Sequence, residues 1–114
     1  VNIGRKIHRK HAMQMALTGE PVSAQDAYRF GLVNQVVPLQ DLREVTERLA
    51  QLIATKSAQA ITTGKRAFYE QIEMPVEEAF EYATREMIAA TRTDDAKEGS
   101  RAFFEKREPV WRDR

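Results

Sequence analysis

The chain has 114 residues, of which 42% are hydrophobic and 31% are charged, so it forms one ordinary domain at most. Its 18 basic and 17 acidic residues nearly balance, which argues against a dedicated nucleic-acid-binding protein. The absence of cysteine excludes disulfides and thiolate metal sites, and no apolar run reaches the roughly 18 residues that a membrane span needs.

Two helices are expected at the start of the chain. Ile7, Ala12 and Met15 lie on one apolar face of a first helix. This helix should end near Gly19, because glycine suits the left-handed conformation just past a helix. Ser23 can then cap a second, short helix by accepting a hydrogen bond from a backbone amide of its first turn.

One short strand is expected after Gly31, where the second helix stops. Residues 32–37 (LVNQVV) are rich in β-branched side chains and are followed by Pro38. A lone strand cannot satisfy its own backbone hydrogen bonds, and no other segment of this sequence reads as a strand. We therefore expect this strand to pair with a segment outside these 114 residues or with another chain.

Four further helices are predicted in the second part of the chain. The clearest covers residues 39–56, where apolar side chains recur on one stripe and charged side chains face away. Another runs from a cap at Ser57 to the interruption before Pro75, which is well placed in the first turn of the next helix. Thr93 should cap the last helix, and Pro109 marks its end. The sequence is thus mostly α, with about six helices and one short strand.

Several segments, read in order, resemble the C-terminal part of enoyl-CoA hydratase/isomerase enzymes, the crotonase family. Residues 12–27 (AMQMALTGEPVSAQDA) and 30–38 (FGLVNQVVP) are similar to the family's "AMEM-LTG--ISA--A" and "GLV--VVP" segments. Residues 93–99 (TDDAKEG) and 102–107 (AFFEKR) are similar to its "T-D--EG" and "AF-EKR". The likeness covers essentially the whole chain and is closest to the enoyl-CoA-hydratase-domain-containing branch.

The resemblance implies a division of the chain and a place in a larger fold. Residues 1–114 would form the C-terminal helical, trimerisation part of the crotonase fold without its N-terminal β/α spiral core. Residues 1–38 would complete that core, and residues 39–114 would form the oligomerisation region. A homo-oligomer, a trimer or a hexamer, is expected, without nucleic acid or membrane as a partner. The expected location is the cytoplasm, or the mitochondrion if the source is eukaryotic.

The resemblance also implies an activity for which this chain supplies no catalytic residue. Family members act on CoA thioesters without a permanently bound cofactor, and they polarise the thioester carbonyl with backbone amides of the N-terminal core. Their acid/base carboxylates also precede the segment matched here. The five glycines of this chain are isolated, and none forms a glycine-rich loop. We therefore expect the 114-residue chain alone to be inactive as a hydratase.

Phe103 and Lys106 are the candidate CoA-binding residues. Their spacing places them on one face of a helix. In the resembling enzymes the matching residues approach the CoA nucleotide, where an aromatic ring can pack against adenine and an ammonium group can meet phosphate. A packed aromatic ring beside a solvated lysine is the alternative.

Other candidate sites are weaker. His8 and His11 could share a helical face and hold a metal ion, but no third ligand is evident and the neighbouring basic residues repel a cation, so no metal site is expected. The basic cluster at residues 5–10 could instead contact a phosphate of CoA or of nucleic acid. The carboxylate pairs fall on polar helix faces and are expected to be solvated.

Three functional classes remain open from the sequence. The leading hypothesis is a segment that completes the CoA site and the subunit interface of an enoyl-CoA hydratase/isomerase, with another crotonase-type reaction on acyl-CoA, such as decarboxylation or thioester hydrolysis, as its variant. A non-catalytic helical assembly module is the alternative from a different class. A small nucleic-acid-binding domain is the third.

Overall fold

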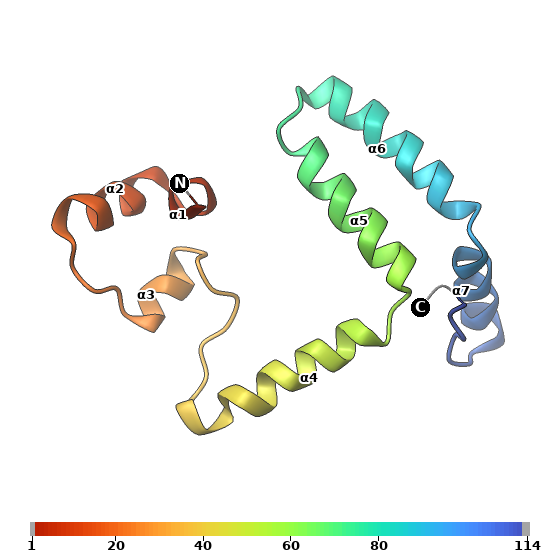
Figure 1. Ribbon diagram of the computed structural model, residues 1–114, viewed down its shortest axis with the longest axis horizontal. Coiled ribbons are helices and arrows are strands. Elements are labelled where there is room, and N and C mark those ends of the chain that lie inside the picture. Colours follow the sequence, from red (N-terminus) through yellow and green to blue (C-terminus); the bar gives the residue numbers. More distant parts are fainter. Residues whose placement is uncertain (1, 113–114) are drawn as a thin grey trace. The chain divides into compact units, whose positions relative to one another are not determined.

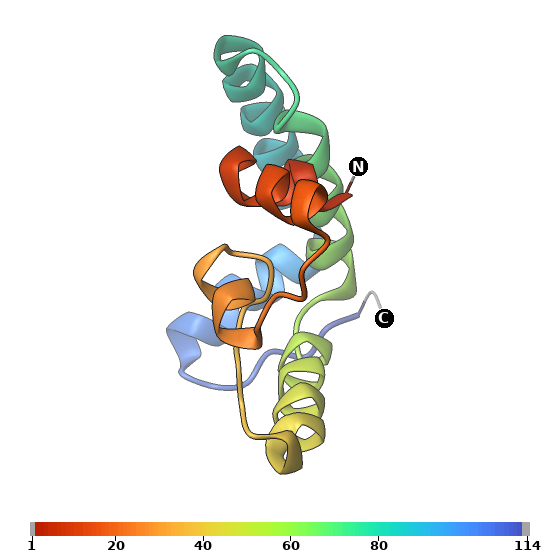
Figure 2. The same cartoon turned by 90° about the vertical axis from the view of Figure 1, so that its left-hand side faces the viewer.

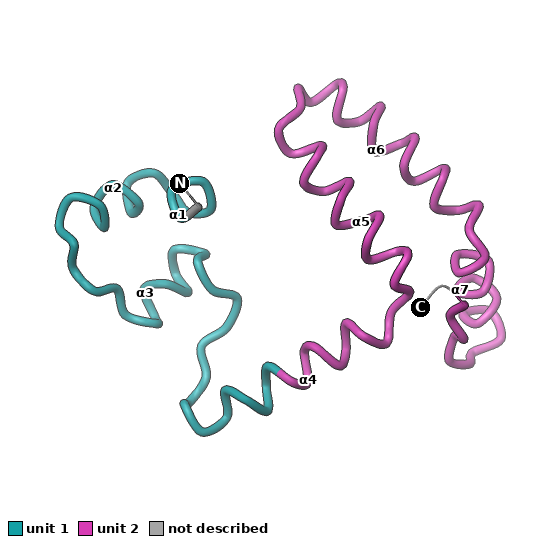
Figure 3. Tube along the Cα trace, in the orientation of Figure 1, with its two compact units in different colours: residues 1–46 teal, residues 47–114 magenta. Residues whose placement is uncertain are grey.

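The computed structural model describes residues 2–112 and shows two compact units, residues 1–46 and 47–114 (Figure 3). In the described part every regular element is a helix, which confirms the mostly α prediction. Seven α-helices are present there, together with one short 3₁₀ helix. None of the described helices is both long and apolar enough to span a bilayer.

The first unit contains α1 (Asn2–Lys6), α2 (Arg9–Thr18), α3 (Ala24–Arg29), the 3₁₀ helix Leu39–Asp41 and the start of α4 (Leu42–Ala54). Helices α1 and α2 lie next to each other in both views (Figures 1 and 2). The expected first helix is therefore two helices, because His8 adopts an extended backbone between them and its imidazole accepts a hydrogen bond from the Lys10 amide at 3.4 Å.

The predicted ends of α2 and α3 are confirmed. Gly19 follows α2 with a φ of 63°, and its amide donates to the Met15 carbonyl at 3.1 Å. Ser23 caps α3, since its hydroxyl accepts from the Asp26 amide at 3.0 Å. Both ends depend on contacts within a few residues, which explains why local sequence patterns predict them.

The predicted strand over residues 32–37 is not formed within the described structure. This segment is irregular between Gly31, which has a φ of 75°, and Pro38. A strand is defined by its pairing with a neighbouring strand, and residues 2–112 contain no such neighbour. The β-branched composition of the segment thus signals an extended preference without supplying the partner that would turn it into a strand.

The second unit contains the rest of α4, α5 (Ala58–Gln71), α6 (Val76–Thr91) and α7 (Asp94–Glu105). Helices α5 and α6 form an antiparallel pair (Figure 1). Arg66 of α5 donates to Glu86 of α6 at 2.9 Å, and the Tyr82 hydroxyl of α6 donates to the Glu70 carboxylate of α5. These polar contacts fasten the two helices along their exposed edge.

The predicted caps of the second unit are also largely confirmed. The Ser57 and Thr93 hydroxyls each accept a backbone amide at 3.1 Å at the starts of α5 and α7. Pro75 lies one position earlier than expected, as the extended residue that precedes α6. Proline suits this position because its ring fixes φ near the −53° that the structure shows, and it has no amide to leave unsatisfied.

Few apolar side chains are buried within the described residues. Ile7, Ala27 and Ala102 form the buried hydrophobic set, whereas the apolar stripe predicted for α4 is about half exposed at Leu49 and Leu52. Large apolar surfaces of this kind are usually covered by other protein in a native assembly. The roles assigned to residues 1–38 and 39–114 stay predictions.

Candidate functional site

Phe103, the first predicted CoA-binding residue, lies in the last turn of α7 and is 80% exposed. Its ring meets the equally exposed ring of Phe104 edge to face, with centroids 5.8 Å apart. An aromatic side chain that is neither buried nor stacked face to face leaves its π-face available to a planar ligand. Phe103 is therefore not a core residue within the described part of the chain, and its role in CoA binding stays a prediction.

Lys106, the second predicted residue, does not continue the helix. Helix α7 ends at Glu105, and Lys106 follows it with φ 53° and ψ 43° in the left-handed region. The argument that a three-residue spacing puts Phe103 and Lys106 on one helical face is therefore wrong. The turn still keeps the two residues together at the end of α7, because the Lys106 amide donates to the Phe103 carbonyl at 3.3 Å.

The left-handed backbone of Lys106 is unusual for its residue type. Within residues 2–112 it is the one residue other than glycine with a positive φ. A left-handed conformation costs a non-glycine residue roughly 1–2 kcal/mol, because Cβ crowds the following carbonyl oxygen. At the matching position after α2 the chain uses Gly19, which avoids this cost.

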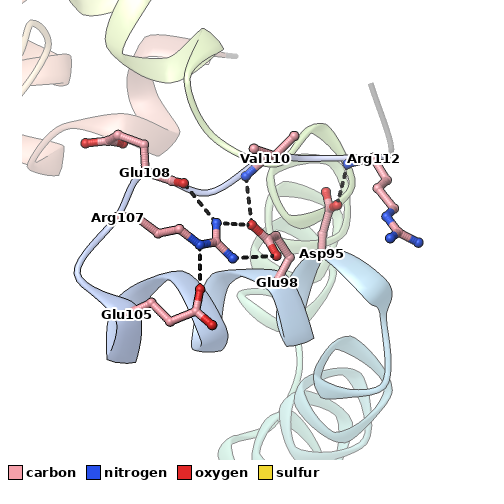
Figure 4. Close-up of polar contacts among 7 residues, drawn as sticks. All are labelled: Asp95, Glu98, Glu105, Arg107, Glu108, Val110 and Arg112. Carbon is pink, nitrogen blue, oxygen red and sulfur yellow. Dashed lines mark hydrogen bonds and ion pairs between the residues drawn. The ribbon is translucent and has the colours of Figure 1, made fainter.

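A carboxylate clasp, formed by Glu98, Glu105 and Arg107, closes the turn around Lys106 (Figure 4). The Arg107 guanidinium donates to both oxygens of Glu98, at 2.6 and 3.2 Å, and to Glu105 at 2.6 Å. Glu98 also accepts the Val110 amide at 3.0 Å, so that one carboxylate joins α7 to the C-terminal segment. Bidentate, charge-assisted contacts of this kind fix geometry more firmly than a single hydrogen bond does.

The clasp shifts the titration of its members. Hydrogen bonds from Arg107, and then from the Val110 amide, lower the pKa of Glu98 from its ordinary 4.5 to about 2. Hydrogen bonds to Glu98 and Glu105 raise the pKa of Arg107, which therefore stays charged. A carboxylate whose pKa falls on folding stabilises the folded state above its unfolded pKa and loses that contribution in acid.

We expect the end of α7 to loosen as the pH falls from about 4.5 toward about 2, the interval between the unfolded and folded pKa values of Glu98. Carboxyl NMR should show Glu98 titrating near 2, and amide exchange at Arg107 and Val110 should accelerate over the same interval. The Glu98→Gln variant should lack this acceleration. A Glu98 midpoint near 4.5 in the wild-type protein would contradict the clasp.

The C-terminal segment is fastened to α7 and α4 at two further points. The Trp111 indole donates to the Thr55 carbonyl at 2.7 Å, and its ring lies over Gly99, where an added Cβ would be 3.3 Å from Cη2. The Arg112 amide donates at 2.9 Å to Asp95, which is only 2% exposed (Figure 4). Trp111 therefore packs the C-terminal segment against α7.

A groove of about 590 Å³ lies between α5, α6 and α7, and none of the three clasp residues lines it. Its walls are mostly apolar and carry small side chains, and they include Ala60, Gly64, Ala67, Ala83, Met87 and Trp111. An apolar lining favours apolar contents over a phosphate. The groove and the end of α7 therefore have different binding chemistry.

The remaining sequence candidates are dispersed. The His8 and His11 rings are 6.0 Å apart, and His11 stacks on Phe30 at 3.8 Å. Among the described residues no group of three His, Cys, Asp or Glu side chains could hold a metal ion. The carboxylate pairs Glu44 with Glu47 and Glu77 with Glu81 lie at exposed positions, as predicted.

Sequence reasoning missed the clasp and the Trp111 contact. Glu98 and Arg107 stand nine positions apart, with a helix end between them, and Trp111 and Thr55 are 56 positions apart. No helical or strand periodicity links such positions. The available signal was the family likeness of the segments 93–99 and 102–107, which contain Glu98 and Arg107.

Comparison with known proteins decides the family. The sequence model described as "Enoyl-CoA hydratase/isomerase" matches residues 2–114. The chain belongs to the enoyl-CoA hydratase/isomerase family. Rat mitochondrial enoyl-CoA hydratase domain-containing protein 3 is 41% identical over 97% of the chain. This relative confirms the branch to which the sequence was closest.

Solved structures of the enoyl-CoA hydratase/isomerase family confirm the fold of the matched part. Enoyl-CoA hydratase from Mycobacterium smegmatis superposes with a TM-score of 0.92 at 41% identity, covering 96% of this chain and 42% of that chain. Human enoyl coenzyme A hydratase domain-containing protein 3 gives 0.93 at 39% identity, covering 96% and 43%. The chain spans 37% of the length of the rat relative.

Proposed function

We propose that the chain is part of an acyl-CoA enzyme of the enoyl-CoA hydratase/isomerase type, in which it completes the CoA site and the subunit interface. The observation that carries this proposal is the family match over residues 2–114. The whole enzyme would add water across, or shift, a carbon–carbon double bond conjugated to a thioester. A CoA thioester would be the substrate, and no permanently bound cofactor is required.

The end of α7 would bind the nucleotide part of CoA. The exposed Phe103 ring offers a face on which adenine can stack, and the Lys106 ammonium offers a compact charge for phosphate. Among residues 2–112 the Lys106 side chain has no ion-pair partner, while Arg107 is already held by two carboxylates. The charge left for a ligand at this end is therefore that of Lys106.

This assignment gives the end of α7 a binding role and not a chemical one. Hydration or isomerisation conjugated to a thioester requires preorganised donors at the carbonyl oxygen, where negative charge develops. A flexible ammonium group and an aromatic ring suit neither that task nor proton transfer at a carbon atom. We accordingly place the reacting double bond away from Phe103 and Lys106.

The apolar helix faces support the second part of the proposal, a subunit interface. Phe80 and Met87 of α6 are 71% and 65% exposed, and Phe68 of α5 and Ile72, which follows α5, are each 53% exposed. A trimer or hexamer, as the family resemblance suggests, would cover such surfaces. A helical assembly module that binds no CoA would use the same faces, so that CoA binding separates the two functions.

We expect Lys106→Ala in the complete protein to raise the KM for crotonyl-CoA about fivefold, or ~1 kcal/mol, with little change in kcat, because a phosphate contact is lost without disturbing the reacting atoms. Hydration of the conjugated thioester is the assay. The effect should shrink with added salt, because counterions screen an exposed charge pair. Phe103→Ala should also raise KM, but with little dependence on salt.

Pantetheine thioesters, which lack the nucleotide, are the control for this experiment. Their turnover should be the same in the wild-type and Lys106→Ala proteins. Equal impairment of CoA and pantetheine substrates would show that Lys106 does not contact the nucleotide. Absence of CoA binding by the complete protein would favour the assembly module.

A further inference from the structure

The residue at position 106 is a lysine where the backbone favours glycine. The turn after α7 has the same form as the turn after α2, in which a left-handed residue follows the helix and its amide bonds back to the last turn. At the first of these turns the chain has Gly19, and at the second it has Lys106. Glycine or asparagine would close the second turn with less strain. Lysine therefore occupies this turn at a backbone cost that glycine would avoid.

Arg107, the residue after Lys106, holds the strained turn in place. The Arg107 amide donates to the Ala102 carbonyl at 3.1 Å, which is the second hydrogen bond of this type of helix end. The Arg107 side chain is fixed at the same time by Glu98 and Glu105, and its guanidinium also donates to the Glu108 carbonyl at 3.1 Å (Figure 4). With residue 107 anchored on both its backbone and its side chain, residue 106 has little freedom to leave the left-handed region.

The clasp also changes the charge that the end of α7 presents to a ligand. Two carboxylates surround Arg107, so this cation is neutralised locally and offers little attraction to an incoming anion. Lys106 is exposed beside it. The clasp thus fixes the direction of the turn and leaves Lys106 as an exposed cation at which a phosphate could be bound.

We propose that Arg107 is a positioning residue for CoA binding, which acts through Glu98 and Glu105 to hold Lys106 in its left-handed conformation, with its ammonium directed to a phosphate of the CoA nucleotide. This inference rests on the proposed function, in which Lys106 contacts that nucleotide. Arg107 itself touches no substrate. Its contribution is that the cation beside Phe103 is ordered before the ligand arrives, which lowers the entropy lost on binding.

Two substitutions of Lys106 separate strain from function in the complete protein. Lys106→Gly and Lys106→Asn both suit the left-handed turn, so we expect thermal stability equal to or higher than that of the wild type. Both should still raise the KM for crotonyl-CoA about fivefold, with unchanged turnover of a pantetheine thioester. A fall in stability in both variants would overturn the assignment of strain at position 106.

A double-mutant cycle tests whether Arg107 acts through Lys106. We expect Arg107→Ala to raise the KM for crotonyl-CoA severalfold, to leave kcat and pantetheine turnover unchanged, and to add nothing further in the Lys106→Ala background. Coupling of this kind is the signature of two residues that serve one contact. Glu98→Gln keeps the size of the clasp and provides a milder second variant if Arg107→Ala fails to fold; it should show the same coupling to Lys106.

The outcomes distinguish the two levels of the proposal. If Lys106→Ala leaves the ratio of CoA to pantetheine KM values unchanged, the proposed nucleotide contact itself is wrong. If Lys106→Ala changes that ratio but Arg107→Ala and Glu98→Gln do not, the contact stands and the positioning role is overturned. Effects of Arg107→Ala and Lys106→Ala that add fully would also overturn it, since independent residues would then be responsible.

Discussion

Replacing Trp111 with alanine should destabilise α7 by about 2 kcal/mol, the largest single effect that we expect outside the binding site. Removal of a large buried aromatic side chain costs about 3–5 kcal/mol, and Trp111 is only partly buried. The variant loses both the ring packed over Gly99 and the indole hydrogen bond to the Thr55 carbonyl. Native-state amide exchange of α7 measures this loss locally, as a lower free energy of opening.

Trp111→Phe is the matched variant for this measurement. It keeps an aromatic ring near Gly99 but removes the N–H donor, so that the Thr55 carbonyl loses its partner. We expect a loss of about 1 kcal/mol, the typical net contribution of one hydrogen bond. Protection of α7 that is unchanged in Trp111→Ala would show that the indole does not hold the C-terminal segment against this helix.

Enlarging Ala102 is expected to have the second large effect. Ala102 is 2% exposed, and its carbonyl accepts the amides of both Lys106 and Arg107. Ala102→Leu adds three carbon atoms at a closed site, and overpacking of this kind costs about 1–3 kcal/mol. A shift of the α7 backbone would also disturb the turn around Lys106. Amide exchange should therefore show faster opening at Lys106 and Arg107.

Arg101→Leu is the control for Ala102→Leu. It introduces the same side chain one position earlier, where the native residue is exposed. Arginine and leucine have similar helix propensities, so we expect a change within about 0.5 kcal/mol. Equal destabilisation by the two leucines would point to a general effect of apolar substitution in α7 and would contradict tight packing at Ala102.

Sequence patterns predicted the helices well because helix ends depend on hydrogen bonds between residues that are close in sequence. Ser57 and Thr93 cap α5 and α7 through bonds to amides three residues away, and Gly19 ends α2 through a bond to a carbonyl four residues away. The break at His8 was missed, since a histidine cap has no strong sequence signature. Residues 32–37 form no strand in the described structure, because composition indicates only a backbone preference and the expected pairing partner lies outside this chain.

The CoA-binding role of the two candidate residues stays a prediction, and the structure corrects the geometry expected for them. Phe103 and Lys106 were selected from a family likeness, and the structure places both at one end of α7. Their relative arrangement could not follow from helical spacing, because the helix stops between them. The left-handed turn is stabilised by the contact between Arg107 and Glu98, which joins the segment after the helix to α7 itself. Such a contact depends on the folded path of the chain, which local periodicity does not encode.

The clasp also has a consequence for how this protein can vary through evolution. Glu98 serves two donors at once, the Arg107 guanidinium and the Val110 amide. A charge reversal at position 98 or 107 would place like charges together, and a neutral replacement would leave one charge without its partner, so natural replacements at the two positions should occur together. Position 105 supplies only one acceptor to Arg107, so amino-acid substitutions there should be tolerated more often. Aligned relatives should accordingly show coupled substitution at 98 and 107 and independent substitution at 105.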